Sequence, residues 1–286
     1  MICKFLCVPF LIRAQGDVFH DADSLRDLHQ YRLASVEYER VIFLHPDGEV
    51  AARAQLRKAA CEKMLGLYDQ AATGLESVDI QQLADTALRY RILFEGMVTA
   101  YLAHEPARAM ARQAVIIHYY PDSARSRDLM LLGILSLNEM QRWQEADTAY
   151  RRYMHLWGGG YDPATSPYSH IPKLKNPDKA ENLSAFLPFT GAGLFYAGDA
   201  PEAILNMALQ LGFIAFGAYS VLMERYITGI LVGVGGYAAF YHGGVRRARR
   251  VAEMYNERES LRFNTLVRNG LMRVRAPRED SSGEHR

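Results

Sequence analysis

The sequence is poor in cysteine and lacks the residue clusters that catalysis needs. Its three cysteines, Cys3, Cys7 and Cys61, form no disulfide framework and no Cys-x-x-Cys metal pair. The nine histidines are scattered, without a His-x-x-x-His or Glu-x-x-His spacing, and no Gly-x-Ser-x-Gly motif occurs. We therefore predict no cofactor, no metal and no catalytic residue, and we expect a protein that is not an enzyme.

An excess of one charge is also missing. The chain carries 33 basic and 32 acidic residues, a formal net charge of +1, which argues against a global nucleic-acid-binding surface. Strand patterns are nearly absent from residues 23–157, where apolar residues recur at helical spacing. The sequence predicts an all-α protein, and 286 residues leave room for about two domains.

The longest apolar stretch lies in the C-terminal part of the chain. Ala203–Met223 contains no charged residue, and Tyr226–His242 again lacks acid, lysine and arginine. Because about 20 mostly apolar residues cross a bilayer as a helix, we predict a transmembrane helical hairpin. The alternative is the buried hairpin of a soluble protein, which glycine disfavours because it is costly inside a water-exposed helix. Small residues four apart let helices approach closely, and the predicted packing residues are Ala208, Gly212, Gly229 and Gly233.

The N-terminus has the layout of a short secretory signal peptide. Lys4 precedes an apolar run over residues 5–12, and Ala14 and Gly16 are the small residues of a cleavage site after Gly16. Arg13 is unusual between the apolar run and that site. We predict that residues 1–16 are a signal peptide; the alternative is the N-terminus of a cytoplasmic protein.

Residues 17–157 contain an internal repeat. A small alanine is followed four residues later by an aromatic or apolar residue, and successive alanines lie 37, 36 and 39 residues apart (71−34, 107−71, 146−107). We interpret the repeat as stacked helix pairs that cross closely at the alanine. The residues predicted to pack the pairs are Ala34, Tyr38, Ala71, Leu75, Ala107, Ala146 and Tyr150.

Three segments of this region resemble the second helix of the tetratricopeptide repeat: YRLASVEYERVIFLHP, LYDQAATGLESV and RWQEADTAYRRY. Gly133 also fits the first-helix glycine of that repeat. The resemblance implies an α-solenoid that binds another polypeptide in a groove, and it implies no catalysis. The alternative is an ordinary helical bundle with accidental spacing.

Residues 158–182 predict a linker between this solenoid and the hairpin. Gly158–Gly160 are followed by Pro163, Pro167, Pro172 and Pro177, and residues of both types end helices. Residues 183–244 form the predicted membrane module. Its first part carries the pattern Pro-x-x-Gly-x-Gly-x-x-Tyr-x-Gly and resembles the small bacterial two-helix modules of the TM2 type, a family with no settled activity. The motif residues are Pro188, Gly191, Gly193, Tyr196 and Gly198.

Residues 245–286 form a basic tail. It predicts an amphipathic helix on anionic lipid headgroups, with little aromatic interleaving that would indicate nucleic-acid binding. Arginine-rich flanks prefer the cytoplasm, so two crossings would place the repeats inside and three would place them outside. The arginines predicted to contact headgroups are Arg246, Arg247, Arg249 and Arg250.

Repeats and a membrane hairpin in one chain predict a membrane-anchored scaffold. We expect it to bind a protein partner at the bacterial cell envelope, with the repeats in the periplasm and the hairpin forming homo- or hetero-oligomers. One alternative is a component of membrane transport or lipid handling, with Asn206 and Gln210 along a polar path. Another is a soluble helical protein.

Overall fold

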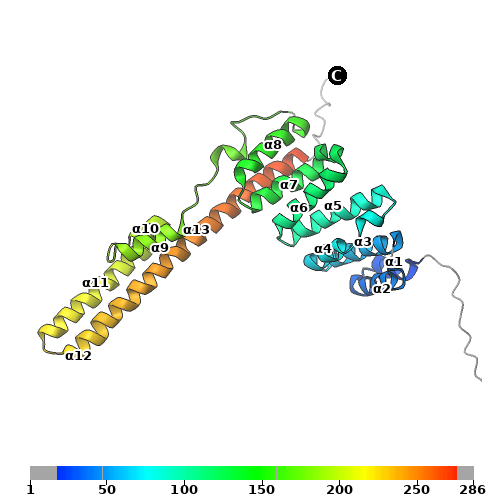
Figure 1. The fold of residues 1–286 in the computed structure, drawn as a ribbon. Coiled ribbons are helices and arrows are strands. Elements are labelled where there is room, and N and C mark those ends of the chain that lie inside the picture. Colours follow the sequence, from blue (N-terminus) through cyan, green and yellow to red (C-terminus); the bar gives the residue numbers. More distant parts are fainter. Residues whose placement is uncertain (1–17, 47, 159, 276–286) are drawn as a thin grey trace, which may run out of the picture. The chain divides into compact units, whose positions relative to one another are not determined.

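The computed structural model describes residues 18–46, 48–158 and 160–275, and every regular element within them is a helix (Figure 1). This confirms the predicted all-α fold for the described residues. The chain divides into two compact units, Met1–Tyr161 and Asp162–Arg286, here called unit 1 and unit 2. The predicted signal peptide, residues 1–16, lies outside the described residues.

The described part of unit 1 consists of consecutive helix pairs. Each helix contacts the next along the chain, and α5 also contacts α3 and α7. Short 3₁₀ turns, η1 (Ile80–Gln82) and η2 (Pro121–Arg125), follow the second and third pairs. The pairs are α1 (His20–Asp27) with α2 (Tyr31–Leu44), α3 (Glu49–Met64) with α4 (Tyr68–Glu76), α5 (Thr86–Leu102) with α6 (Pro106–Tyr119), and α7 (Arg127–Glu139) with α8 (Trp143–Trp157).

The same turn joins the two helices of every pair. A residue with a left-handed backbone stands in each turn, at intervals of 37, 38 and 37 residues (66−29, 104−66, 141−104). Its N–H donates to the carbonyl three residues earlier, and the next N–H donates to the carbonyl five residues earlier, which is how many helices satisfy their last carbonyl groups. The four turn residues are His29, Gly66, His104 and Gln141.

A fully buried alanine stands five residues after the left-handed residue of each turn. In the third pair, this alanine is not the one that the sequence pattern predicted. Ala107 is exposed, whereas Ala109 is fully buried. The third pair uses this register because it buries the large side chain of Ile116. Burial of this side chain stabilises the fold more than burial of another alanine would. The corrected alanines are 37, 38 and 37 residues apart (71−34, 109−71, 146−109), and they are Ala34, Ala71, Ala109 and Ala146.

In the first helices of the four pairs, the spacing of small buried residues is more regular than in the second helices. Small buried residues occur every 37 residues (59−22, 96−59, 133−96), at Ala22, Ala59, Gly96 and Gly133. Because small residues on both helices let the backbones approach, the large side chains pack around them in successive buried clusters. The predicted packing residues Tyr38, Leu75 and Tyr150 all lie in this buried set.

Unit 2 contains a long helical hairpin and two short helices. The described elements are η3 (Pro167–His170), α9 (Pro177–Phe186), α10 (Ala192–Ala197), α11 (Ala200–Leu222), α12 (Tyr226–Thr228), the π-helical η4 (Gly229–Val234) and α13 (Gly235–Arg275). Among the described helices, α11 is the one long and apolar enough to cross a membrane. The second predicted arm is shorter, and it continues into the arginines of α13.

Two predicted boundaries in this unit differ from the structure. The predicted linker 158–182 ends at Asn176, because Asn176 accepts a hydrogen bond from the Lys179 N–H at 3.0 Å and begins α9. Pro177 is the first residue of the helix, where its missing N–H costs nothing. The predicted boundary between residues 244 and 245 is also absent, because α13 runs through it without interruption. The predicted tail therefore continues the second arm of the hairpin.

Candidate functional site

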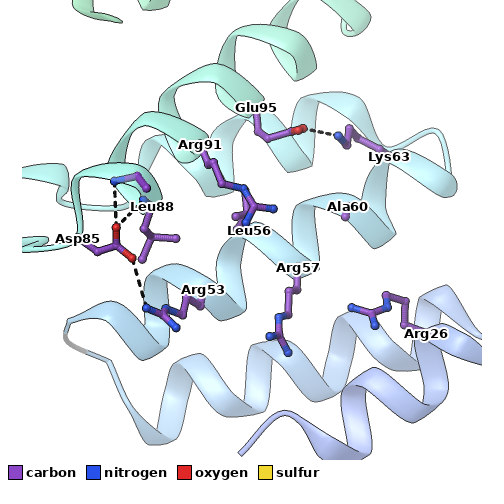
Figure 2. Close-up of a pocket in the computed structure, with 11 residues that line it drawn as sticks. Arg26, Arg53, Leu56, Arg57, Ala60, Lys63, Asp85, Leu88, Arg91 and Glu95 are labelled. Carbon is purple, nitrogen blue, oxygen red and sulfur yellow. Dashed lines mark hydrogen bonds and ion pairs between the residues drawn. The ribbon is translucent and has the colours of Figure 1, made fainter. Parts of the chain in front are cut away.

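A groove crosses α1, α3 and α5, the first helices of the first three pairs. It has a volume of about 480 Å³, within the range of about 300–1,000 Å³ usual for ligand sites. Leu56, Ala60, Ala87 and Leu88 form its apolar part, and Figure 2 shows Arg91 reaching from α5 toward Leu56 on α3. The charged residues of its walls are Arg26, Arg53, Arg57, Lys63, Asp85, Arg91 and Glu95.

Four of the five basic side chains of the groove have carboxylate partners. Arg53 lies 3.4 Å from Asp85 and 3.3 Å from Glu49, and Lys63 is paired with Glu95. Arg91 is different, because it is exposed and has no hydrogen bond or ion pair with any residue that the structure describes. Sequence reasoning missed this groove, although Arg53 and Arg57 stand one helical turn apart on α3.

The remaining two basic residues are held by Asp23 of α1. Its carboxylate lies 2.9 Å from Arg26 and 2.5 Å from Arg57, and it accepts a hydrogen bond from the Tyr38 hydroxyl. Arg57 also stacks 4.2 Å above the Phe19 ring. Burial, together with the hydrogen bond to Asp23, raises the pKa of Tyr38. Tyr38 thus joins α2 to α1, beyond its predicted packing role.

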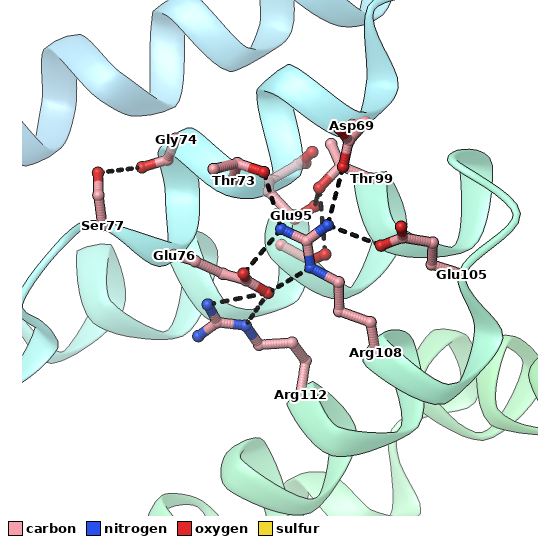
Figure 3. A network of polar contacts seen from close by, with 11 residues as sticks. Asp69, Thr73, Gly74, Glu76, Ser77, Glu95, Thr99, Glu105, Arg108 and Arg112 are labelled. Carbon is pink, nitrogen blue, oxygen red and sulfur yellow. Dashed lines mark hydrogen bonds and ion pairs between the residues drawn. The ribbon is translucent and has the colours of Figure 1, made fainter.

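A second polar network joins α4 to α6 (Figure 3). Arg108 donates to both carboxylate oxygens of Glu76, at 2.8 and 2.7 Å, and also to Asp69 and Glu105, at 3.0 and 2.7 Å. Arg112 lies 3.3 Å from the same Glu76, and burial lowers its pKa. Because these arginines are already bound by carboxylates on neighbouring helices, we interpret the network as structural.

Glu62 of α3 is a buried acid with an incomplete set of partners. Its side chain is 5% exposed and lies 3.5 Å from Lys58, and its second carboxylate oxygen has no hydrogen bond. Burial raises the pKa of Glu62, an effect that Lys58 reduces. The unfolded chain therefore loses the Glu62 proton at a lower pH than the folded chain, and unit 1 loses stability as pH rises through the folded pKa.

We predict that Glu62→Gln removes this pH dependence. Above the folded pKa, the variant should exceed the wild type by about 1 kcal/mol in free energy of unfolding, the scale of one buried polar group. Urea unfolding from pH 4 to pH 8, followed by tryptophan fluorescence, measures the difference. Both tryptophans of the chain, Trp143 and Trp157, lie in α8, so this signal reports unit 1. Parallel pH profiles for the two proteins would contradict the prediction.

In unit 2, the predicted membrane-module motif forms a compact cluster between α9, α10 and α13. A Cβ on Gly193 would lie 2.1 Å from the Ala180 carbonyl, so only glycine fits there. Gly191 and Gly198 have left-handed backbones, and the Tyr196 hydroxyl accepts the Asn176 N–H at 3.1 Å. Pro188 lies half-buried in the turn before α10. The motif therefore holds the helices together and presents no reactive group.

The two arms of the hairpin cross at glycines, only two of which were predicted. A Cβ on Gly233 would lie 2.5 Å from the Gly217 Cα, and one on Gly229 would lie 3.1 Å from the Gly217 carbonyl. Ala208 and Gly212 do not take part, because both are exposed, and a Cβ on Gly212 would meet nothing within 4 Å. The predicted pair of α11 is therefore wrong for this contact, which uses Gly217 instead.

The polar residues of α11 are bound within the protein. The Gln210 side chain donates from Nε2 to the side-chain oxygen Oδ1 of Asn206 at 2.5 Å, and its Oε1 accepts the Phe189 N–H at 3.3 Å. Asn206 donates in turn to the Phe240 carbonyl at 3.3 Å. The cavity beside them measures only about 10 Å³, near the lower limit for a single water molecule. These amides join three segments of unit 2, and we do not propose a transport path along them.

The four predicted headgroup arginines divide into two classes. Arg247 lies 2.6 Å from Glu202, and Arg249 is paired with Asp178, Glu181 and Glu253. Arg246 and Arg250 are exposed and have no ion pair or hydrogen bond with any other residue in the described part of the chain. Because they are four residues apart, they share one face of α13.

Comparison of the chain with protein-family models, curated proteins and solved structures finds no match. The resemblances to tetratricopeptide repeats and to TM2-type modules therefore stay predictions. The described residues contain no group of three histidine, cysteine or acidic side chains placed to hold a metal ion.

Proposed function

We propose that this chain is a membrane-anchored scaffold, in which unit 1 binds a protein partner and the hairpin of unit 2 is held in the bilayer. The observation that carries the proposal is the apolar surface of the hairpin. In the most apolar window of α11 only 11% of residues are buried, and Leu222 and Ile227 are 80% and 77% exposed. So large a continuous apolar surface is rare on soluble proteins and is typical of helices in lipid.

Carbonate extraction of membranes that contain the full chain tests the anchor. We expect the chain to stay in the membrane pellet at high pH, because only the lipid core covers the apolar surface of α11. Release into the soluble fraction would contradict the proposal. It would favour the alternative in which the hairpin is covered by other protein.

Unit 1 is the part that we propose to bind the partner. Stacked helix pairs present extended concave surfaces, and unit 1 has a groove across three first helices. The partner is a polypeptide, and self-association through the hairpin is a second proposed contact.

We propose that unit 1 lies outside the cytoplasm, at the bacterial cell envelope. The support is the signal-peptide pattern of residues 1–16. A reporter that is active only in the periplasm, fused after Trp157, should be active. An inactive reporter at this position would place unit 1 in the cytoplasm.

The division of the arginines predicts which ones contact lipid. Replacing Arg246 and Arg250 by Gln should weaken the binding of phosphatidylglycerol to the detergent-solubilised chain by about thirtyfold, because each of the two basic residues near an anionic surface contributes about 1 kcal/mol. Thermophoresis during a lipid titration measures the effect. The matched control replaces Arg247 and Arg249, which are paired with protein carboxylates, and should change binding by less than about threefold. Equal losses in the two double variants would contradict the prediction.

A further inference from the structure

The groove across α1, α3 and α5 offers positive charge to a ligand. Five basic side chains line it against two acidic ones. Most of these cations are satisfied by carboxylates of unit 1, so the groove is not a continuous cationic surface. Its one cation without a partner in the described chain is Arg91. A ligand carboxylate at Arg91 would form a charge-assisted hydrogen bond without displacing any protein contact.

The surroundings of Arg91 favour a polypeptide over a nucleic acid. Leu56, Ala60 and Leu88 provide apolar surface beside it, which suits the methylene groups of a peptide. None of the described residues that line the groove is aromatic, whereas proteins that bind single-stranded nucleic acids stack bases on aromatic rings.

We propose that this groove binds an acidic, extended polypeptide segment, with a carboxylate on Arg91 and its apolar parts against Leu56 and Ala60. The inference rests on the proposed function, since it names the kind of partner segment that unit 1 takes. Figure 2 shows the two halves of the site facing each other, Arg91 on α5 and Leu56 with Ala60 on α3. Both helices contribute to one buried cluster of unit 1, with Ala59 of α3 packed in it together with Leu88 and Ile92 of α5.

Fluorescence anisotropy with labelled oligoglutamate, on the full chain in detergent, tests the site. We expect oligoglutamate to bind, oligoglutamine to bind at least about tenfold more weakly, and added salt to weaken the oligoglutamate complex. Arg91→Gln should weaken binding by about tenfold. Ala60→Phe should do the same by filling the groove, and because Ala60 is exposed the fold should accept the larger side chain.

The matched control is Arg152→Gln, an exposed arginine on α8 outside the groove, which should bind within about twofold of the wild type. Equal affinity for the two peptides, wild-type binding in the Arg91 and Ala60 variants, or an equal loss in the Arg152 variant would overturn the proposal. So would tighter, Arg91-dependent binding of oligothymidine. Carbonate extraction is independent of this assay. A negative peptide-binding result would not bear on the proposed membrane anchor, and release by carbonate would not bear on the proposed peptide site.

Discussion

Gly233→Leu is expected to disrupt the hairpin of unit 2. A Cβ at this position would lie 2.5 Å from the Gly217 Cα and 3.2 Å from the Phe213 carbonyl. Both contacts are to backbone, which cannot rotate away as a side chain can, so the two arms must separate. Forcing larger groups into a packed contact typically costs about 1–3 kcal/mol and occasionally more, and we expect this site at or above the upper end. The midpoint of heat-induced aggregation in detergent should fall by about 10 °C.

The control for this prediction is Gly212 of α11, a glycine that the sequence pattern selected together with Gly233. A Cβ on Gly212 would meet nothing within 4 Å, so Gly212→Leu should leave the aggregation midpoint within about 2 °C of the wild type. Both variants add the same side chain to the same hairpin. A larger loss in the Gly212 variant would mean that the arms cross on the other face of α11.

Ala109→Leu is expected to destabilise unit 1 by about 1–3 kcal/mol in free energy of unfolding. Ala109 is fully buried in the cluster that contains Leu93 and Met97 of α5 and Leu129 of α7. Three added carbon atoms would push the third helix pair apart. Urea unfolding followed by the fluorescence of Trp143 and Trp157 measures unit 1, since α8 contains both tryptophans.

Ala107→Leu makes the same substitution two residues earlier and should change the free energy of unfolding by less than about 0.5 kcal/mol. Ala107 lies in the first turn of α6 and is exposed. The pair of variants therefore tests the register of the third repeat. A destabilisation by Ala107→Leu that equals or exceeds the effect of Ala109→Leu would restore the register that the alanine pattern suggested.

The repeat was predictable from sequence, but its register was not predictable at every copy. Tyr38 and Tyr150 identify the buried face of their helices, because each follows the buried alanine by four residues. The third copy, PARAMARQAVIIHY, offers several alanines on different faces. The choice of Ala109 depends on burying Ile116, a contact with other helices that no local pattern contains.

In the hairpin, the sequence identifies apolar helices with closely spaced glycines, but it does not identify which residues of the two helices contact each other. Glycines four apart indicate close packing, but Gly229 and Gly233 require a partner on α11, and that partner depends on how the two helices rotate. The π-helical turns of η4 (Gly229–Val234) shift this rotation. The pairing of Arg247 with Glu202 likewise joins residues far apart in sequence, so the four arginines look equivalent until the fold is known.

The groove lay outside the sequence prediction for a similar reason. Arg26, Arg57 and Arg91 are spread over three helix pairs, and each is ordinary in its own helix. Their shared wall exists because the pairs stack with a nearly constant period, which places successive first helices side by side. A repeat of 37 residues (96−59) thus determines where the charges meet, while the sequence of one repeat does not.

If the hairpin is held in a bilayer as proposed, the uninterrupted course of α13 makes this helix a mechanical lever. Its 41 residues extend about 60 Å at 1.5 Å per residue, and 31 of them (275−245+1) lie beyond the apolar arm. A helix that left the bilayer without a hinge would transmit a change of tilt along its length. A tilt of about 20°, the average for helices in membranes, would move a point about 45 Å from the bilayer sideways by about 15 Å. Bilayer thickness would thereby be converted into a displacement far from the lipid.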